Sequence, residues 1–139
     1  MNNLKKLIEW YENLKEGCLD EIDFYYDEKV FFKDPFNEIA GRENLRKIFV
    51  HMFDNLDNPR FVIIDTINNR ESVFLTWNFF LKIKGKEIQI DGSSHLKCNK
   101  DNKIVYHRDY WDVGEEVLLK IPFIKSLYGL FRNKLALSQ

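Results

Sequence analysis

The sequence predicts a single α+β domain, and three observations lead to this fold class. Apolar residues recur at helical spacing through much of the first 56 residues, and from Arg60 the apolar spacing changes to two. No internal repeat, low-complexity tract or linker divides the 139 residues, a length typical of one domain. Helices followed by a run of strands indicate helices packed on one side of a meandering antiparallel sheet.

The first half of the chain predicts three helices and one strand. Gly17 and the pair Asn58-Pro59 are placed to end the first and third helices, because glycine and proline disfavour their continuation. Alternation in the strand places Phe32 and Asp34 on the same face. The predicted helices are residues 4–14, a short segment from 20 to 26, and 42–56, and the predicted strand is residues 30–34.

The second half predicts four strands joined by short turns. Each strand alternates apolar and polar residues, so that one face of the sheet is apolar. Gly92 lies in the middle of the third of these strands and predicts a bulge or a sharp bend there. The predicted strands are residues 61–67, 72–84, 87–98 and 104–112.

The composition excludes several classes of protein. Lys and Arg number 21 against 22 for Asp and Glu, so no net field attracts nucleic acid or an anionic membrane. Cys18 and Cys98 are too far apart for a zinc motif and too few for a disulfide framework. No apolar run resembles a signal peptide or a membrane span. We expect a cytoplasmic protein that uses no metal and no cofactor.

Four short motifs resemble the SnoaL-like or nuclear-transport-factor-like superfamily, the fold of ketosteroid isomerase and limonene epoxide hydrolase. The motifs are Gly17-Cys18-Leu19-Asp20, Val30-Phe31-Phe32-Lys33-Asp34-Pro35, Gly41-Arg42-Glu43-Asn44-Leu45 and Arg108-Asp109-Tyr110-Trp111-Asp112. The resemblance implies a cone-shaped, strongly curved antiparallel sheet packed against the N-terminal helices, a cystatin-like α-β(4) roll. It assigns residues 1–112 to the SnoaL-like domain and leaves 113–139 as an apolar helical extension.

The resemblance also implies a pocket between the concave face of the sheet and the helices. Asp34, His107 and Asp109 become candidates for acid–base catalysis, since His107 and Asp109 lie two apart on one strand face. Aromatic residues and one serine are expected to contact the ligand. These predicted contacts are Trp10, Tyr26, Phe32, Phe49, Trp77, Phe79, Ser94 and Trp111.

The two best-known chemistries of the superfamily are not expected. Asp34 corresponds to the base of ketosteroid isomerase, but its two oxyanion donors correspond to Trp10 and Ser94. Asp109 resembles one acid of limonene epoxide hydrolase, whereas its arginine and second acid would come from the strand that carries Trp77 and Phe79. This sequence therefore keeps one catalytic residue of each enzyme, Asp34 for the isomerase and Asp109 for the hydrolase.

Structural roles remain open for the same polar residues. Asp34 precedes a proline, where aspartate often accepts backbone hydrogen bonds in a turn, and buried groups such as His107 and Asp109 usually find partners. The predicted function is a pocket that binds a small apolar molecule, with acid–base turnover of isomerase or hydrolase type. The alternative is a non-catalytic binding or dimerisation module.

Two apolar surfaces predict contacts with other elements. The outer face of the sheet carries the aromatic side chains of Phe74, Phe80, Tyr106 and Tyr110, which predict a homodimer through that face. The extension 113–139 is apolar with a basic edge, and we expect it to pack on the same domain or on a partner subunit. Membrane-surface contact is not expected, because the overall charge is balanced.

Overall fold

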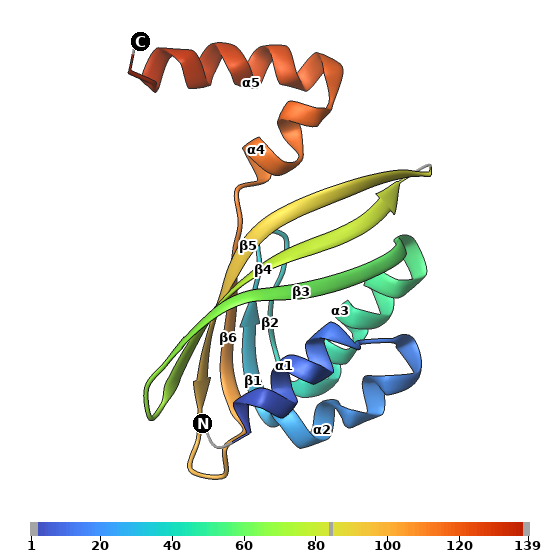
Figure 1. The fold of residues 1–139 in the computed structure, drawn as a ribbon, viewed down its shortest axis with the longest axis vertical. Helices are drawn as coiled ribbons and strands as arrows, with labels where there is room; N and C mark the ends of the chain where they lie inside the picture. Colours follow the sequence, from blue (N-terminus) through green and yellow to red (C-terminus); the bar gives the residue numbers. More distant parts are fainter. Residues whose placement is uncertain (1–2, 84, 138–139) are drawn as a thin grey trace.

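The computed structural model describes residues 3–83 and 85–137, and its helices and strands are arranged as an α+β domain (Figure 1). Lys84, the last residue of one predicted strand, lies outside the described residues. The elements in chain order are α1 (Leu4–Glu12), the 3-10 helix η1 (Glu16–Glu21), α2 (Ile22–Tyr25), β1 (Tyr26–Lys33), β2 (Glu38–Ala40), α3 (Arg42–Asn55), β3 (Asp57–Asn68), β4 (Ser72–Ile83), β5 (Lys86–Cys98), β6 (Ile104–Tyr110), α4 (Val113–Glu116), the 3-10 helix η2 (Leu118–Lys120) and α5 (Pro122–Leu135).

The sheet has six strands in the order β2-β1-β6-β5-β4-β3. It is strongly curved, and α1, α2 and α3 cover its concave side (Figure 1). The predicted fold class is confirmed, but the sheet is mixed rather than wholly antiparallel. β1 pairs with β6 in parallel, because the last strand of the meander inserts beside β1 after the chain has passed through β2, α3 and three antiparallel strands.

Three local features differ from the sequence-based expectations. Tyr26 begins β1 instead of ending the second helix, and the three-residue strand β2 was not predicted. Its sequence, Glu38–Ala40, is too short to show a period. The helical extension predicted over 113–139 is divided into α4, η2 and α5, and Pro122 begins α5, where its missing N–H would have no partner inside the helix in any case.

Gly92 does not form a bulge, and its place in β5 has a different cause. β4 and β5 keep one continuous register through the pair Trp77–Gly92. A Cβ atom on residue 92 would lie 2.3 Å from Cη2 of the Trp77 indole. Only glycine therefore lets the indole of Trp77 lie against the neighbouring strand.

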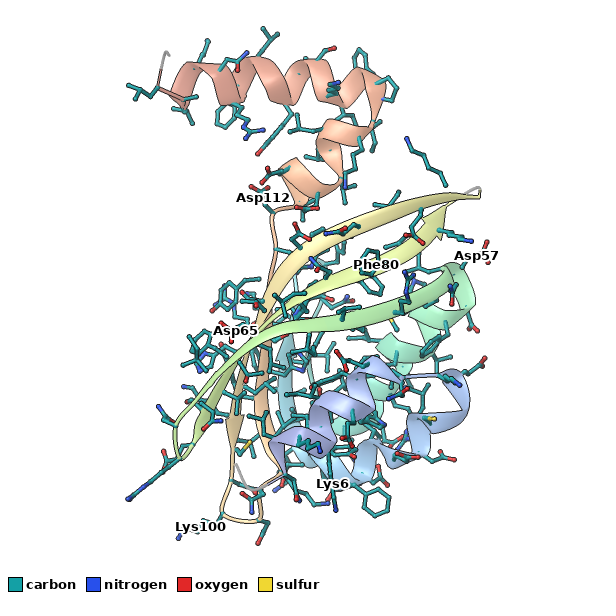
Figure 2. The ribbon with its side chains drawn as sticks, viewed as in Figure 1. Lys6, Asp57, Asp65, Phe80, Lys100 and Asp112 are labelled. Atoms are coloured by element: carbon teal, nitrogen blue, oxygen red, sulfur yellow. The ribbon has the colours of Figure 1, made fainter. Side chains whose placement is uncertain are left out.

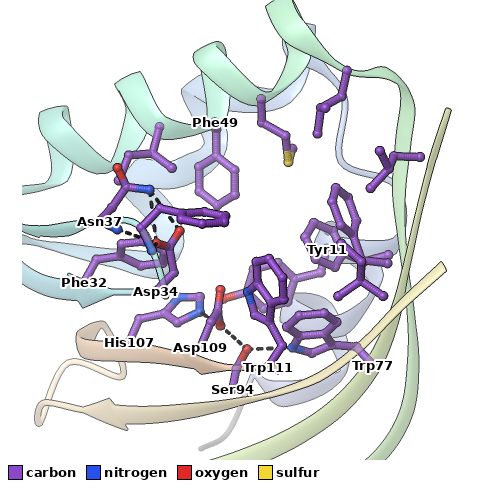
Figure 3. Close-up of a pocket in the computed structure, with 18 of the residues that line it drawn as sticks. Tyr11, Phe32, Asp34, Asn37, Phe49, Trp77, Ser94, His107, Asp109 and Trp111 are labelled. Carbon is purple, nitrogen blue, oxygen red and sulfur yellow. Dashed lines mark hydrogen bonds and ion pairs between the residues drawn. The ribbon is translucent and has the colours of Figure 1, made fainter. Parts of the chain in front are cut away.

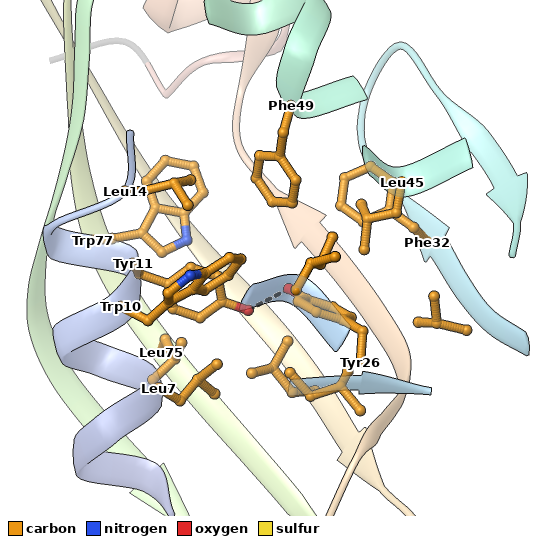
Figure 4. Packing of buried hydrophobic residues seen from close by; sticks show 14 of the residues in the cluster. Leu7, Trp10, Tyr11, Leu14, Tyr26, Phe32, Leu45, Phe49, Leu75 and Trp77 are labelled. Atoms are coloured by element: carbon orange, nitrogen blue, oxygen red, sulfur yellow. Dashed lines mark hydrogen bonds between the residues drawn. The ribbon is translucent and has the colours of Figure 1, made fainter. Parts of the chain in front are cut away.

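The hydrophobic core lies between the concave face of the sheet and the three helices (Figure 4). The alternation predicted for β4 and β5 is confirmed, because the side chains of Leu75 and Leu96 point into this core and are fully buried or nearly so. Helical positions spaced by three and four supply the opposite wall. Fully buried core residues include Leu7, Ile22, Tyr26, Val30, Leu45, Val73 and Ile104.

The C-terminal extension leaves the sheet at Asp112, whose side chain accepts the N–H of Glu115 and caps α4 (Figure 2). The ring of Tyr128 in α5 packs so closely on Gly114 that a Cβ there would lie 2.2 Å from it. The rest of α5 projects away from the sheet (Figures 1 and 2). None of residues 122–135, all of which the structure describes, is buried.

Candidate functional site

A cavity of about 450 Å³ opens between the concave face of the sheet and helices α1 and α3. Most of its wall consists of aromatic and aliphatic side chains, and a few polar groups gather where β1, β5 and β6 meet (Figure 3). This volume and this composition are typical of sites for small organic molecules.

Nine of the eleven predicted site residues line this cavity, and two do not. All three candidates for acid–base chemistry are in the wall, and so are six of the eight predicted ligand contacts. The side chains of Trp10 and Tyr26 are not in the wall but in the core: the Trp10 indole donates to the carbonyl oxygen of Cys18 at 3.4 Å and packs on Tyr25. The nine are Phe32, Asp34, Phe49, Trp77, Phe79, Ser94, His107, Asp109 and Trp111.

Tyr11, rather than Trp10, is the α1 residue that faces the cavity. The correspondence with ketosteroid isomerase placed Trp10 at the wall, and neighbouring helix positions are rotated by about 100°. A difference of one position along α1 therefore places the Tyr11 side chain at the cavity and the Trp10 indole in the core.

Other lining residues were not predicted, for two reasons. Ile48 and Met52 belong to the apolar stripe of α3, and Leu56 follows the last residue of that helix. Their apolar spacing is visible in the sequence, but it does not distinguish core residues from residues of the cavity wall. Phe36 and Asn37 lie in the turn after β1, where no period exists to place them. The ring of Phe36 packs edge-on against Trp111, with 5.4 Å between the ring centres.

The carboxylate of Asp34 is held by the turn that follows it. Its Oδ1 accepts the backbone N–H of Phe36 at 2.7 Å and that of Asn37 at 2.6 Å. The side-chain amide of Asn37 donates to both carboxylate oxygens at 3.1 Å. This is the turn arrangement that aspartate before proline favours, and it engages both oxygens of Asp34.

The carboxylate of Asp109 is held by side chains from the sheet. Its Oδ1 accepts the hydroxyl of Ser94 at 2.5 Å and lies 2.7 Å from Nε2 of His107 (Figure 3). Ser94 in turn accepts the indole N–H of Trp77 at 2.8 Å. Oδ2 of Asp109 receives no hydrogen bond from the residues that the structure describes. The side chain of Asp109 is 18% exposed, so one oxygen remains available to a ligand.

A second chain of hydrogen bonds reaches Asp109 from the core. The hydroxyl of Tyr26 lies 2.8 Å from Nδ1 of His107, and the hydroxyls of Tyr11 and Tyr26 share a hydrogen bond. With Nε2–H of a neutral His107 donating to Asp109, Tyr26 donates to Nδ1 and Tyr11 donates to Tyr26. Burial raises the pKa of both tyrosine hydroxyls, with a further rise from the charge of Asp109. Both tyrosines therefore stay protonated and able to donate.

In these two series of hydrogen bonds, every polar side chain is bonded within the protein. The exception is Oδ2 of Asp109, which accepts no hydrogen bond from the described residues. The two donor chains converge on Oδ1 of Asp109, and Oδ2 remains as an acceptor beside apolar walls. His51 and Asn55 of α3 form a further polar pair along the cavity, with Nδ1 of His51 and Nδ2 of Asn55 3.1 Å apart.

Among the described residues, no group of three or more His, Cys, Asp or Glu side chains could hold a metal ion. Within the same part of the chain, no helix is long and apolar enough to cross a membrane.

Solved structures with the same fold come from several bacteria. An NTF2-like protein of unknown function from Burkholderia pseudomallei K96243 superposes with a TM-score of 0.72 at 14% identity, covering 83% of this chain and 94% of that chain. A putative SnoaL-like polyketide cyclase from Jannaschia sp. CCS1 gives 0.69 at 10% identity, covering 81% and 84%. An LEH-like epoxide hydrolase from M. tuberculosis gives 0.67 at 16% identity, covering 96% and 93%.

No curated protein matches the chain. The model of the SnoaL-like domain family matches residues 7–107, a segment that runs from the middle of α1 to the middle of β6 and contains Ser94 and His107. The recognised motif Arg108–Asp112 continues directly from this segment and supplies Asp109. The chain therefore belongs to the SnoaL-like domain family, with the nuclear-transport-factor-like fold.

Proposed function

We propose that this protein binds a small, mainly apolar molecule in the cavity, and that Asp109 acts on it as a general base. The observation that carries the proposal is the state of the Asp109 carboxylate. Its Oδ1 is fixed by Ser94 and near His107, while Oδ2 faces a largely apolar cavity without a hydrogen bond from the described residues.

This arrangement favours abstraction of a proton from carbon or oxygen. A carboxylate oxygen with few hydrogen-bond donors is a better proton acceptor than a solvated one, and apolar walls exclude the water that would compete. The cavity offers several aromatic side chains to a planar ligand, with Trp77 and Phe79 on the β4 wall and Phe49 on the α3 wall. Proton abstraction is a step shared by isomerisations, cyclisations and water activation, so the reaction type follows from the ligand.

The relatives support a ligand-handling role in general terms. The solved structures with this fold include one described as a putative polyketide cyclase, one as an epoxide hydrolase and one as a putative isomerase. Those activities are different reactions on organic molecules in the same kind of cavity, and fold alone does not decide between them.

Binding can be tested with a pair of matched probes, α-naphthol and α-tetralone. They have similar two-ring skeletons, but the first donates a hydrogen bond and the second only accepts one. In the wild type we expect α-naphthol to bind about tenfold more tightly, because a hydrogen bond to a charged group contributes about 1.5–3 kcal/mol. Quenching of tryptophan fluorescence measures both affinities, since Trp77 and Trp111 line the cavity.

Asp109→Asn should reverse this preference. The asparagine carbonyl oxygen must accept from Ser94 and His107, which leaves its N–H₂ group facing the ligand. The variant is expected to prefer α-tetralone. Equal affinities of both proteins for both probes would contradict the placement of Asp109 at the ligand.

Catalysis is tested with nitrobenzisoxazole, a small planar carbon acid. A base removes its ring C–H proton, the N–O bond breaks, and a coloured nitrophenolate is released with no need for an oxyanion donor. We expect the wild type to accelerate this elimination and Asp109→Asn to lose about 100-fold or more of the rate, the scale of general-base catalysis. Retention of the rate in Asp109→Asn would refute the role as a base.

A non-catalytic binding module is the second candidate function, and two observations favour it. Asp34, which corresponds to the base of ketosteroid isomerase, is engaged in its own turn, and the donors that line the site are already bonded within the protein. Under this function the probe preference would still depend on Asp109, but the elimination would run no faster than with free acetate.

We also propose that two copies associate through the outer face of the sheet. Phe74 and Tyr110 on this face are 45% and 42% exposed. The ring of Phe74 stacks on His95, which extends the aromatic surface across neighbouring strands. Phe74→Asp is expected to convert a dimer into a monomer in sedimentation-velocity experiments, and an unchanged sedimentation coefficient would reject this interface.

A further inference from the structure

The helix α5 carries an apolar stripe that no described part of the chain covers. Its members recur at a spacing of three or four residues, which places them on one side of the helix. They are between 58% and 76% exposed. The tail stripe is Phe123, Leu127, Leu130, Phe131 and Leu135.

The charges of this segment are all of one sign. Residues 118–137 contain four cationic side chains and no Asp or Glu, whereas the whole chain has a net charge of −1. The remainder of the chain therefore has a net charge of −5. Lys125 and Arg132 are roughly 160–180° from Phe123 when the helix is viewed end-on, on the side away from the tail stripe. The four cations are Lys120, Lys125, Arg132 and Lys134.

We propose that α5 binds the surface of an anionic lipid bilayer, with the tail stripe among the acyl chains and its cations at the headgroups. An exposed helix with one apolar side, aromatic residues on that side and only basic charges has the composition of an interfacial membrane helix. Its 14 residues span about 21 Å, less than the ~30 Å of a bilayer core, so the helix lies along the surface.

The balanced total charge argued against membrane contact, but the distribution of charge changes that expectation. Three of the four cations lie in the projecting helix, while Lys120 in η2 pairs with Glu116 and the carbonyl oxygen of Gln89. The anionic surface therefore attracts α5 and repels the acidic body of the domain. Lys134 falls within the tail stripe in projection, and its long side chain can extend its ammonium group to the headgroups.

A second copy of the chain fits α5 less well. An antiparallel pair of α5 helices would bring cations together with no acidic residue between 118 and 137 to pair with them. On the outer face of the sheet, cations already cover the aromatic rings, since Arg60, Lys97 and Arg108 lie over Phe80, Tyr106 and Tyr110. The carboxylates of that face are engaged as well, Glu87 by Arg60 and Asp91 by the side-chain amides of Asn78 and Gln89. Both surfaces therefore offer a basic helix little charge to pair with.

The test is vesicle flotation of the full chain, with vesicles of phosphatidylcholine alone or mixed with phosphatidylglycerol. We expect flotation with the mixed vesicles and much less with phosphatidylcholine, with a decrease at high salt. Leu127→Asp with Phe131→Asp should weaken partitioning at least about tenfold, because two large apolar side chains leave the bilayer. Both positions are exposed in α5, so the fold should tolerate the change, and circular dichroism checks this.

Two charge-reversal pairs separate the role of α5 from the total charge. Lys125→Glu with Arg132→Glu should lose the preference for anionic vesicles. Lys5→Glu with Lys100→Glu changes the total charge equally at exposed positions of the body and should keep that preference. Equal effects of the two pairs would contradict the proposal, as would a wild type that fails to float with the mixed vesicles.

Sedimentation velocity without lipid tests the alternative that α5 binds a second copy of the chain. The Leu127→Asp, Phe131→Asp protein should have the same oligomeric state as the wild type. If these changes instead dissociate an oligomer, α5 is an interface between copies and the lipid proposal is overturned.

Discussion

Asp34 and Asp109 are both carboxylates in the wall of one cavity, yet their surroundings differ in origin. Asp34 at the end of β1 is bonded by the two residues that follow it closely, Phe36 and Asn37. Asp109 in β6 is bonded by Ser94 of β5 and lies within 2.7 Å of a nitrogen of His107. One carboxylate stabilises local backbone geometry, and the other depends on the assembly of the sheet.

The difference shows why the position of an acid at a cavity does not assign it a chemical role. The turn bonds both oxygens of Asp34, whereas the described residues of the sheet bond only Oδ1 of Asp109. The number of hydrogen-bond donors that the fold places around a carboxylate therefore determines how many of its oxygens can bind a ligand. Changes in the sheet should therefore affect Asp109 and leave Asp34 as it is, and changes in the turn should do the reverse.

The largest effect on stability is expected from Gly92→Ala. The new Cβ would overlap the Trp77 indole at 2.3 Å, and overpacking a core costs about 1–3 kcal/mol or more. A shifted indole would also draw its N–H away from Ser94, weakening the support of Asp109. Urea denaturation measures the stability, and the nitrobenzisoxazole assay measures the site. Normal values in both would show that the indole moves freely.

Asp34→Ala should have the next largest effect on stability. We expect a loss of about 2 kcal/mol in the free energy of unfolding, because two backbone N–H groups lose a charged acceptor. Asp34→Asn keeps an acceptor for the turn and should cost less than about 1 kcal/mol. Neither change should lower the elimination rate as Asp109→Asn does. A rate loss equal to that of Asp109→Asn would make Asp34 the base.

Tyr26→Phe is expected to cost about 1–2 kcal/mol, since it leaves Nδ1 of the buried His107 without its partner. Tyr11→Phe should cost less, because Tyr26 can still donate to His107. Thermal or chemical unfolding of the two variants gives the comparison. A reversed order would indicate that the hydrogen bond between the two tyrosines, rather than the one to His107, stabilises the chain.

The smallest effect is a loss of stability in alkali. Burial raises the pKa of Tyr11 and Tyr26 above the ordinary value of 10.0, so above that pH the unfolded chain loses protons that the folded chain keeps. The stability that these groups contribute is complete well below pH 10 and falls as the pH rises through 10, where the tyrosines of the unfolded chain lose their protons. We expect about 1 kcal/mol in total between pH 9.5 and 10.5, and the Tyr11→Phe, Tyr26→Phe double variant should lack this slope.

The sequence predicts the sheet-borne part of the site well, because strand alternation is a strict rule. A period of two placed Ser94 on one face of its strand and His107 with Asp109 on one face of theirs, the family resemblance implied that these faces point inward, and all three residues line the cavity. For Asp34 the sequence left two roles open, catalysis and backbone bonding in the turn, and the choice depends on the conformation of the turn at Asn37. The choice between Trp10 and Tyr11 failed because it requires the rotation of α1 about its own axis, which apolar spacing defines only loosely.

Longer-range features were also beyond the sequence. The parallel pairing of β1 with β6 joins segments separated by most of the chain, and local periodicity carries no information on it. The ring of Tyr128 in α5 packs closely on Gly114 of α4, a contact that the sequence does not indicate. Its apolar composition was evident, but the sequence indicated packing on a protein surface rather than projection from the domain.

The contact between Trp77 and Gly92 has a consequence for how this cavity could change during evolution. Any side chain at position 92 collides with the indole, and the same indole forms part of the cavity wall. A single substitution at 92 is therefore disfavoured until residue 77 becomes smaller, and a smaller residue 77 enlarges the cavity. Among related chains we expect substitutions at positions 77 and 92 to occur together, so that the size of the ligand and the packing of the two strands change together.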